Sequence, residues 1–308
     1  MKPYHRHLLA ATIVAICGLF GWWIGRDIRQ SASRVTLSQV AGPHEKATHP
    51  PSVRSRPARR DEFHDGTTVE IFGSRQPDEA ILRFPSDDSY NAFLFAVQQS
   101  RIQVIDQLDR LRAVRLSYWD REDLTLLLMG ENITTYASIP SVPSPGPSGG
   151  SSQDGLVGFG NGLLPWLGIN SDHSAWGSGV KIAVLDSGIV PHPDLPGLVK
   201  SIEIVPFQQN LSKTHGHGTA VASLISGVND FAPGLAPAAQ LISIRISDDF
   251  GKADSFAMAA GILAAVDSGA DLINISMGTS VDNPLIAEAV LYAQSHHCLL
   301  YTSPSPRD

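Results

Sequence analysis

The sequence predicts an α/β protein: a doubly wound parallel sheet, preceded by a small α+β domain and an N-terminal transmembrane helix. From Val180 onward, apolar strands alternate with helices, which is the pattern of a parallel sheet covered by helices on both faces. Residues 79–140 follow the order β-α-β-β-α-β of a small α+β domain. Leu8 to Gly25 is an uncharged apolar run near the lower length limit for a membrane span.

Size and composition fit a globular protein with room for two domains, since the chain has 308 residues, of which 43% are hydrophobic and 17% charged. The formal net charge of −7 is mild and argues against nucleic acid as a partner. The two cysteines, Cys17 and Cys298, are too few for a disulfide framework and do not decide the redox compartment.

Residues 1–29 are expected to form a signal anchor. Basic residues flank the apolar run on both sides, and the run lacks the small-x-small site of a cleaved signal peptide, although a cleaved signal remains the alternative. We expect a short N-terminus inside the cell and the rest of the chain exported, in the periplasm or outside the cell, and secreted if the segment is cleaved. Residues 30–78 are rich in Ser, Pro, His and Arg and are expected to form a disordered tether.

The expected α+β domain covers residues 79–140. Its elements are a strand at 80–84, a helix at 89–99, strands at 102–108 and 111–117, a helix at 121–129 and a strand at 133–139. Residues 141–155 are rich in Pro, Gly and Ser and therefore predict a linker. Such an accessible segment is also where a protease would cut.

Two residues of the second domain suggest catalysis. An apolar strand beginning at Val180 stops at Asp186, and His217 opens a helix of small and apolar residues. Ligands and catalytic groups collect at the carboxyl ends of parallel strands. A carboxylate there and a histidine at a nearby helix start make the orienting half of a catalytic triad. His215 lies two positions from His217, so the two do not share a helix face, and no third ligand with metal spacing follows.

Four motifs in order resemble those of the subtilisin-like serine peptidases. The segments around Asp186 and His217 resemble the family's aspartate and histidine motifs. Residues 234–239, followed by a strand at 241–246, resemble its Gly-Val-Ala-Pro turn and strand. Residues 272–278 resemble the strand that lies beside bound peptide. The family order of the triad is Asp, His, Ser.

The resemblance implies a serine endopeptidase that hydrolyses peptide bonds in proteins or peptides. It assigns catalysis to Asp186 and His217 and substrate binding to Ser276, Met277 and Gly278, whose backbone would pair with substrate. It requires no cofactor and admits calcium, because Asp194 falls where calcium-binding relatives have a ligand. Residues 79–140 resemble the family's inhibitory propeptide in element order and in position.

The end of the chain departs from the family pattern. Residues 156–300 are expected to be the N-terminal part of a catalytic domain, so that the sheet is incomplete. An anomalous tail at 301–308 contains two prolines where a central strand should continue. Ser280 imitates the nucleophile motif, but Asp282 stands where a small residue belongs. We therefore expect the catalytic serine and the oxyanion asparagine to be missing and this fragment to be inactive. The alternative is a non-catalytic, membrane-tethered binding protein or pseudopeptidase.

Overall fold

A computed structural model describes residues 68–72, 74, 78–129, 131–136, 163–207, 216–230, 233–277 and 283–300. The expected anchor, the linker, His215, Gly278, Ser280 and the tail lie outside these ranges. None of the described helices is long and apolar enough to cross a membrane. The described residues form two five-stranded sheets, each with its own helices.

The first domain contains the elements predicted for residues 79–140 and one more strand. In chain order the elements are β1 (Thr68–Phe72), β2 (Glu79–Arg83), α2 (Asp87–Val97), β3 (Gln103–Leu108), η1 (Asp109–Leu111), β4 (Ala113–Ser117), α3 (Arg121–Leu127) and β5 (Asn132–Tyr136). The sheet order is β3-β4-β2-β1-β5, with β1 antiparallel to β2 and parallel to β5.

Strand β1 corrects the expected boundary of the tether at residue 78. Its sequence, Thr-Val-Glu-Ile-Phe, includes Val69 and Phe72, which are both buried in the domain. The expected tether was too long because composition was averaged over a polar stretch that ends in one short strand. The domain therefore begins at or before Thr68.

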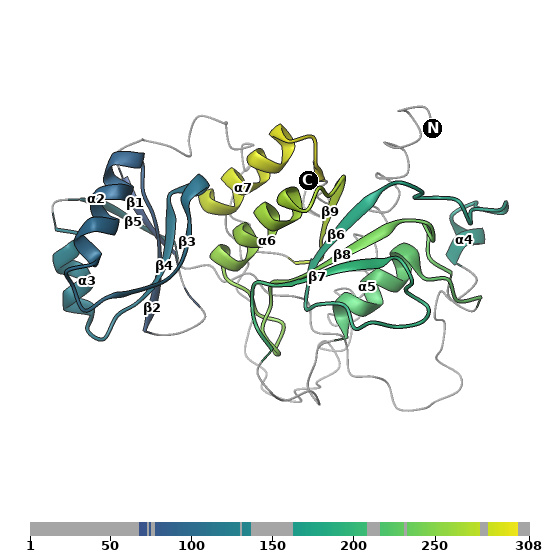
Figure 1. Cartoon of the computed structure of the whole chain (residues 1–308), viewed down its shortest axis with the longest axis horizontal. Helices are drawn as coiled ribbons and strands as arrows, with labels where there is room; N and C mark the ends of the chain where they lie inside the picture. Colours follow the sequence, from purple (N-terminus) through teal and green to yellow (C-terminus); the bar gives the residue numbers. More distant parts are fainter. Residues whose placement is uncertain are drawn as a thin grey trace, which may run out of the picture.

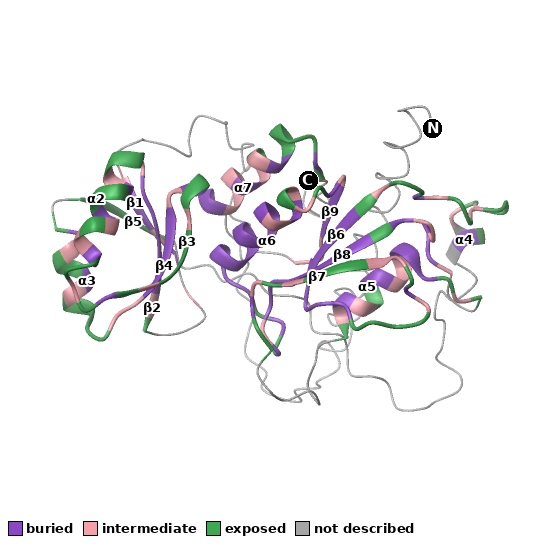
Figure 2. Cartoon of the chain, in the orientation of Figure 1, coloured by how far each residue is buried: buried purple, intermediate pink, exposed green. Residues whose placement is uncertain are grey.

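The two faces of the first sheet pack against different partners. Side chains alternate across a strand, so Ala80 and Leu82 join the core beneath α2 and α3, whereas Ile81 points the other way. Ile81 belongs to a cluster that includes helices α6 (Ser255–Asp267) and α7 (Pro284–Ser295) of the second domain. In Figure 2, strand β4 and much of α6 are purple, the colour of buried residues.

The second domain is an all-parallel sheet with the order β10-β9-β6-β8-β7. Its remaining elements are α4 (Leu163–Trp166), β6 (Lys181–Asp186), β7 (Leu198–Glu203), α5 (His217–Ser226), β8 (Gln240–Arg245), β9 (Leu272–Ile275) and β10 (Leu299–Leu300). Strand β6 is central, and its four middle residues, 182–185, are apolar and buried, as expected for a strand that is covered on both faces.

Helices cover both faces of this sheet, which confirms the predicted doubly wound arrangement. Ile182 and Val184 face the core that contains α5, whereas Ala183 and Leu185 face the core that contains α6 and α7. Figure 1 shows the resulting layers: α2 and α3, the first sheet, α6 and α7, the second sheet, and α5. From β6 the chain passes β8 to reach β7, and from β8 it passes β6 in the opposite direction to reach β9. The connections that leave the neighbouring strands β6 and β8 therefore run in opposite directions along the sheet.

Candidate active site

Asp186 and His217 are in direct contact at the carboxyl end of β6. His217 Nδ1 lies 2.8 Å from Asp186 Oδ2 and 3.0 Å from Oδ1. The two side chains are 1% and 11% exposed respectively. The structure therefore brings together the two catalytic residues that the sequence predicts, at the strand end where the sheet order reverses.

The Asp186 carboxylate is held from its own turn. The next residue, Ser187, donates its backbone N–H to Asp186 Oδ1 at 2.6 Å. Gly188 follows with φ +92°, a left-handed conformation that glycine adopts without the steric cost of a side chain. The Asp-Ser-Gly sequence thus ends the strand sharply and points the carboxylate toward α5.

Helix α5 comes unusually close to this turn because its second residue is glycine. A Cβ on Gly218 would lie 2.4 Å from the carbonyl oxygen of Gly188 and 3.2 Å from Asp186 Cβ. The Gly218 N–H also donates to Ser187 Oγ at 3.1 Å. His217, as the first residue of α5, is therefore fixed by the docking of the helix start on the turn.

The hydrogen bond selects a tautomer of His217. An ionised carboxylate only accepts, so Nδ1 carries the proton and donates it to Asp186. Nε2, on the other side of the ring, is then the nitrogen that can accept a proton. A base with this orientation can take a proton from a hydroxyl group and can return it later.

The predicted substrate residues lie beside this pair as far as the structure describes them. Strand β9 pairs with β6 in parallel, with Ile275 opposite Leu185, so Ser276 follows at the level of Asp186. Ser276 and Met277 are half-buried, whereas Gly278 lies outside the described residues. Ser276 Oγ accepts a hydrogen bond from the Asn274 side chain at 2.9 Å.

Asp194, the residue for which the resemblance admits calcium, makes local hydrogen bonds. Its Oδ2 accepts from the side-chain amide nitrogen of Asn229 at 2.8 Å. The backbone N–H of Asp194 donates to His192 Nδ1 at 3.1 Å. No group of three or more His, Cys, Asp or Glu residues that could hold a metal occurs in the part of the chain that the structure describes.

Sequence reasoning missed the residues that position the pair. Gly218 was recognised only as a small residue of a buried helix, and Ser187 only as part of a turn. Arg245, the last residue of β8, is buried and donates to the Ser187 carbonyl oxygen at 2.7 Å. A charged residue between the isoleucines 244 and 246 was the signal that could have identified it.

Comparison with known proteins connects this geometry to a family. The subtilase family matches residues 177–303. Thermitase of Thermoactinomyces vulgaris is 37% identical over 124 residues, which cover 39% of this chain and 44% of thermitase. Subtilisin Savinase of Lederbergia lenta is 34% identical over 126 residues, which cover 40% of this chain and 46% of the relative. The chain thus spans less than half the length of these relatives.

A solved structure supports the fold independently. Fervidolysin from Fervidobacterium pennivorans, described as a keratinolytic enzyme related to subtilisin, has a TM-score of 0.51 at 22% identity. The likeness covers 76% of this chain and 41% of that chain, so it extends beyond residues 177–303 into the first domain. At this identity it concerns the fold alone. Over residues 177–303 this chain is therefore similar to the subtilase family, and the Asp186–His217 geometry lies within that matched segment.

Proposed function

We propose that the chain is part of a serine endopeptidase in which Asp186 is the orienting carboxylate and His217 the general base of an Asp/His/Ser triad. The observation that carries the proposal is the 2.8 Å contact between His217 Nδ1 and Asp186 Oδ2 at the end of β6. Relatives of the same segment are named as proteases, among them the minor extracellular protease Epr of Bacillus subtilis.

The pair would act on a serine hydroxyl in two proton transfers. His217 Nε2 takes the proton as the serine oxygen attacks the peptide carbonyl carbon, and an acyl-enzyme forms when the amine leaves with that proton. Water then repeats the sequence and releases the second product. Asp186 holds the ring in the required tautomer and stabilises the imidazolium that forms in each half.

Substrate would lie along the end of β9. Ser276, Met277 and Gly278 would pair through their backbone with an extended peptide, as a strand added to the sheet. The assignment is supported by the pairing of β9 with β6, because β6 ends in Asp186 and β9 leads into Ser276.

A fluorophosphonate probe, which labels an activated serine, tests the proposal on the product of the complete gene. We expect labelling that disappears in His217→Ala and persists in Ser280→Ala, because Ser280 is not the proposed nucleophile. A folded product that the probe does not label would overturn the proposal and would favour a non-catalytic binding protein. Sequencing the gene beyond the codon for Leu300 shows whether a serine motif follows in frame.

We further propose that the first domain is a propeptide-like inhibitory domain. Its support is an extensive contact with α6 and α7, the helices that cover one face of the catalytic sheet (Figure 1). One apolar cluster spans both domains and joins the first sheet to these helices. Its first-domain members are Phe72, Ile81, Leu111 and Ala113.

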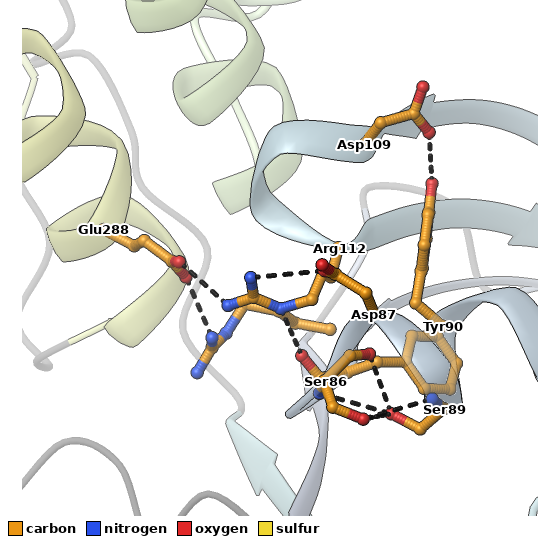
Figure 3. Close-up of polar contacts among 9 residues, drawn as sticks. Ser86, Asp87, Ser89, Tyr90, Asp109, Arg112 and Glu288 are labelled. Carbon is orange, nitrogen blue, oxygen red and sulfur yellow. Dashed lines mark hydrogen bonds and ion pairs between the residues drawn. The ribbon is translucent and has the colours of Figure 1, made fainter.

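Ion pairs surround this apolar contact, with the arginines in the first domain and the carboxylates in the second. Arg83 Nη1 lies 2.8 Å from Glu288 Oε2 in α7, and Arg112 Nη2 lies 3.1 Å from Glu288 Oε1. Figure 3 shows Arg112 reaching Glu288 from the first domain. Arg115 pairs with Asp254, the buried N-cap of α6. Arginines of one domain meet carboxylates of the other, which is the complementarity of a specific interface.

The proposed arrangement of the whole chain follows from these parts. Residues 8–25 would anchor it in a membrane, and the linker at 141–155 would be cut to separate the first domain from the catalytic part. Cutting the linker of the complete gene product without separating the domains should leave the enzyme inactive. Activity that does not rise when the first domain is removed would contradict an inhibitory role.

A further inference from the structure

We propose that Arg245 is a positioning residue for the Asp186–His217 pair and acts through Ser187. The inference rests on the proposed function, in which this pair does the proton transfer. Arg245 ends β8, whereas Asp186 ends β6 and His217 begins α5, and it contacts the turn that follows Asp186.

Arg245 sits beside Asp186 in the sheet and is anchored at three points. The two residues are register partners in the β6–β8 pairing, and Arg245 is 1% exposed. Its Nη1 donates to the carbonyl oxygen of Ser187 at 2.7 Å and its Nε to that of Val205 at 3.0 Å. Its Nη2 pairs with Asp249 Oδ1 at 2.5 Å. The planar guanidinium thus fixes three acceptors at once.

A charged side chain at this position has no explanation in packing alone. Burying an ion costs several kcal/mol before its partners compensate, and the residues on either side, Ile244 and Ile246, are fully buried aliphatic residues. Phe207 covers the guanidinium, with its ring centroid 3.8 Å from the arginine Cζ. Arg245 is therefore a buried cation, and one of its donors binds the backbone of the turn that follows Asp186.

Ser187 transmits this restraint to both members of the pair. Its backbone N–H donates to Asp186 Oδ1 at 2.6 Å, and its Oγ accepts from the Gly218 N–H at 3.1 Å. Gly218 is the residue after His217. A rotation of Ser187 would therefore misdirect the N–H that orients the carboxylate and would release the start of α5. By holding the Ser187 carbonyl oxygen, Arg245 prevents that rotation.

The arginine side chain also lies against the turn itself. Its Cβ and Cδ would be 3.6 and 3.7 Å from a Cβ placed on Gly188. These are ordinary van der Waals distances, so the arginine side chain runs next to the turn and leaves no wide gap there.

Proton NMR of the full chain tests the inference. A histidine Nδ1 proton shared with a carboxylate resonates far downfield, and the His217→Asn variant assigns that signal. We expect the signal to be lost in Arg245→Gln and to be weaker, through faster exchange with water, in Arg245→Lys. Lysine keeps the charge and can still donate to Ser187, but it cannot hold Val205 at the same time.

Arg83→Gln is the matched control, because Arg83 is a buried arginine, 3% exposed, that pairs with Glu70 in the first domain. It removes a buried charge without touching the site and should leave the signal unchanged. Folded Arg245 variants with the wild-type signal would overturn the inference, as would a wild-type chain without the signal. If Arg245→Gln does not fold, Arg245→Lys decides. Failure of the peptidase proposal would instead appear as absent fluorophosphonate labelling.

Discussion

Glu288 is the acidic residue on which the contact between the two domains converges. It accepts hydrogen bonds from Arg83 at 2.8 Å and from Arg112 at 3.1 Å, and its side chain is 22% exposed. A hydrogen bond to a charged group contributes about 1.5–3 kcal/mol. Glu288→Gln keeps one neutral acceptor, Arg83 keeps its partner Glu70, and solvent screens part of the charge. We therefore expect Glu288→Gln to lower the free energy of opening the first domain by about 2 kcal/mol.

Hydrogen exchange of the full chain measures this loss locally. The amides paired between β2 and β4 exchange only when the first domain opens. A loss of about 2 kcal/mol corresponds to about thirtyfold faster exchange, at 1.4 kcal/mol per factor of ten. Amides of the β6–β8 pairing in the second sheet serve as the internal reference and should change much less, because α7 remains packed on that sheet.

The matched control is Glu203→Gln, the same chemical change at an exposed position of β7. Surface substitutions of this kind usually stay within about 0.5 kcal/mol, which is about a twofold change in exchange. If Glu288→Gln behaves like this control, the ion pairs do not stabilise the interface and the domains are held by apolar contact alone. Salt should reduce the difference between Glu288→Gln and the wild type, since the group is partly exposed.

Three further outcomes follow from named contacts. Gly218→Ala should lower the free energy of unfolding in urea by about 1–3 kcal/mol, because the new Cβ would lie 2.4 Å from the Gly188 carbonyl oxygen; Gly216→Ala, with open space at its Cβ, should not, and equal effects would contradict the close approach. Burial raises the pKa of Cys298 to about 11, so iodoacetamide should alkylate it slowly at pH 8 in the native chain and quickly after unfolding, as peptide mapping would show; fast native alkylation would disagree. Burial, and then a hydrogen bond to an aspartate, raises the pKa of Tyr90 in the folded state. The stability that Tyr90 contributes through this shift is therefore complete below about pH 10, where the phenol of the unfolded chain ionises, and is lost as the pH rises further. In Tyr90→Phe the free energy of unfolding should fall less steeply above that pH than in the wild type, and an equal fall would refute this.

The elements of the fold were predictable where hydrophobic patterning was strong. The helix at 89–99 and the strands at 102–108 and 111–117 correspond to α2, β3 and β4 with shifts of a few residues. Two strands, β1 and β7, were missed. Most residues of β7 are exposed because it is an edge strand, so it shows no apolar run, and β1 follows a long polar stretch.

The contact between Asp186 and His217 was predictable because its signals are local. Asp186 ends an apolar strand and His217 opens a helix, and each motif can be recognised within ten residues. The restraints on the pair were not predictable, because they depend on sheet order. Arg245 becomes a neighbour of Asp186 only when β8 pairs with β6, and no pattern in the sequence states which strands are adjacent.

The contact between the domains was not predicted from the sequence either, because it too joins residues that are far apart in the chain. The segment between β8 and α6 shows how one of its ion pairs is formed. Asp254 caps α6 through its Oδ1, which accepts from the Ala257 N–H at 2.8 Å, and offers its other oxygen to Arg115 of the first domain. A buried carboxylate needs several hydrogen-bond donors. Asp254 obtains one from the first turn of α6 and another from an arginine of the first domain. Arg245 begins this connection, beside the turn that follows Asp186, and Asp254 ends it, at the domain interface. The segment that joins β8 to α6 thus carries at its two ends the charges that organise the site and the interface.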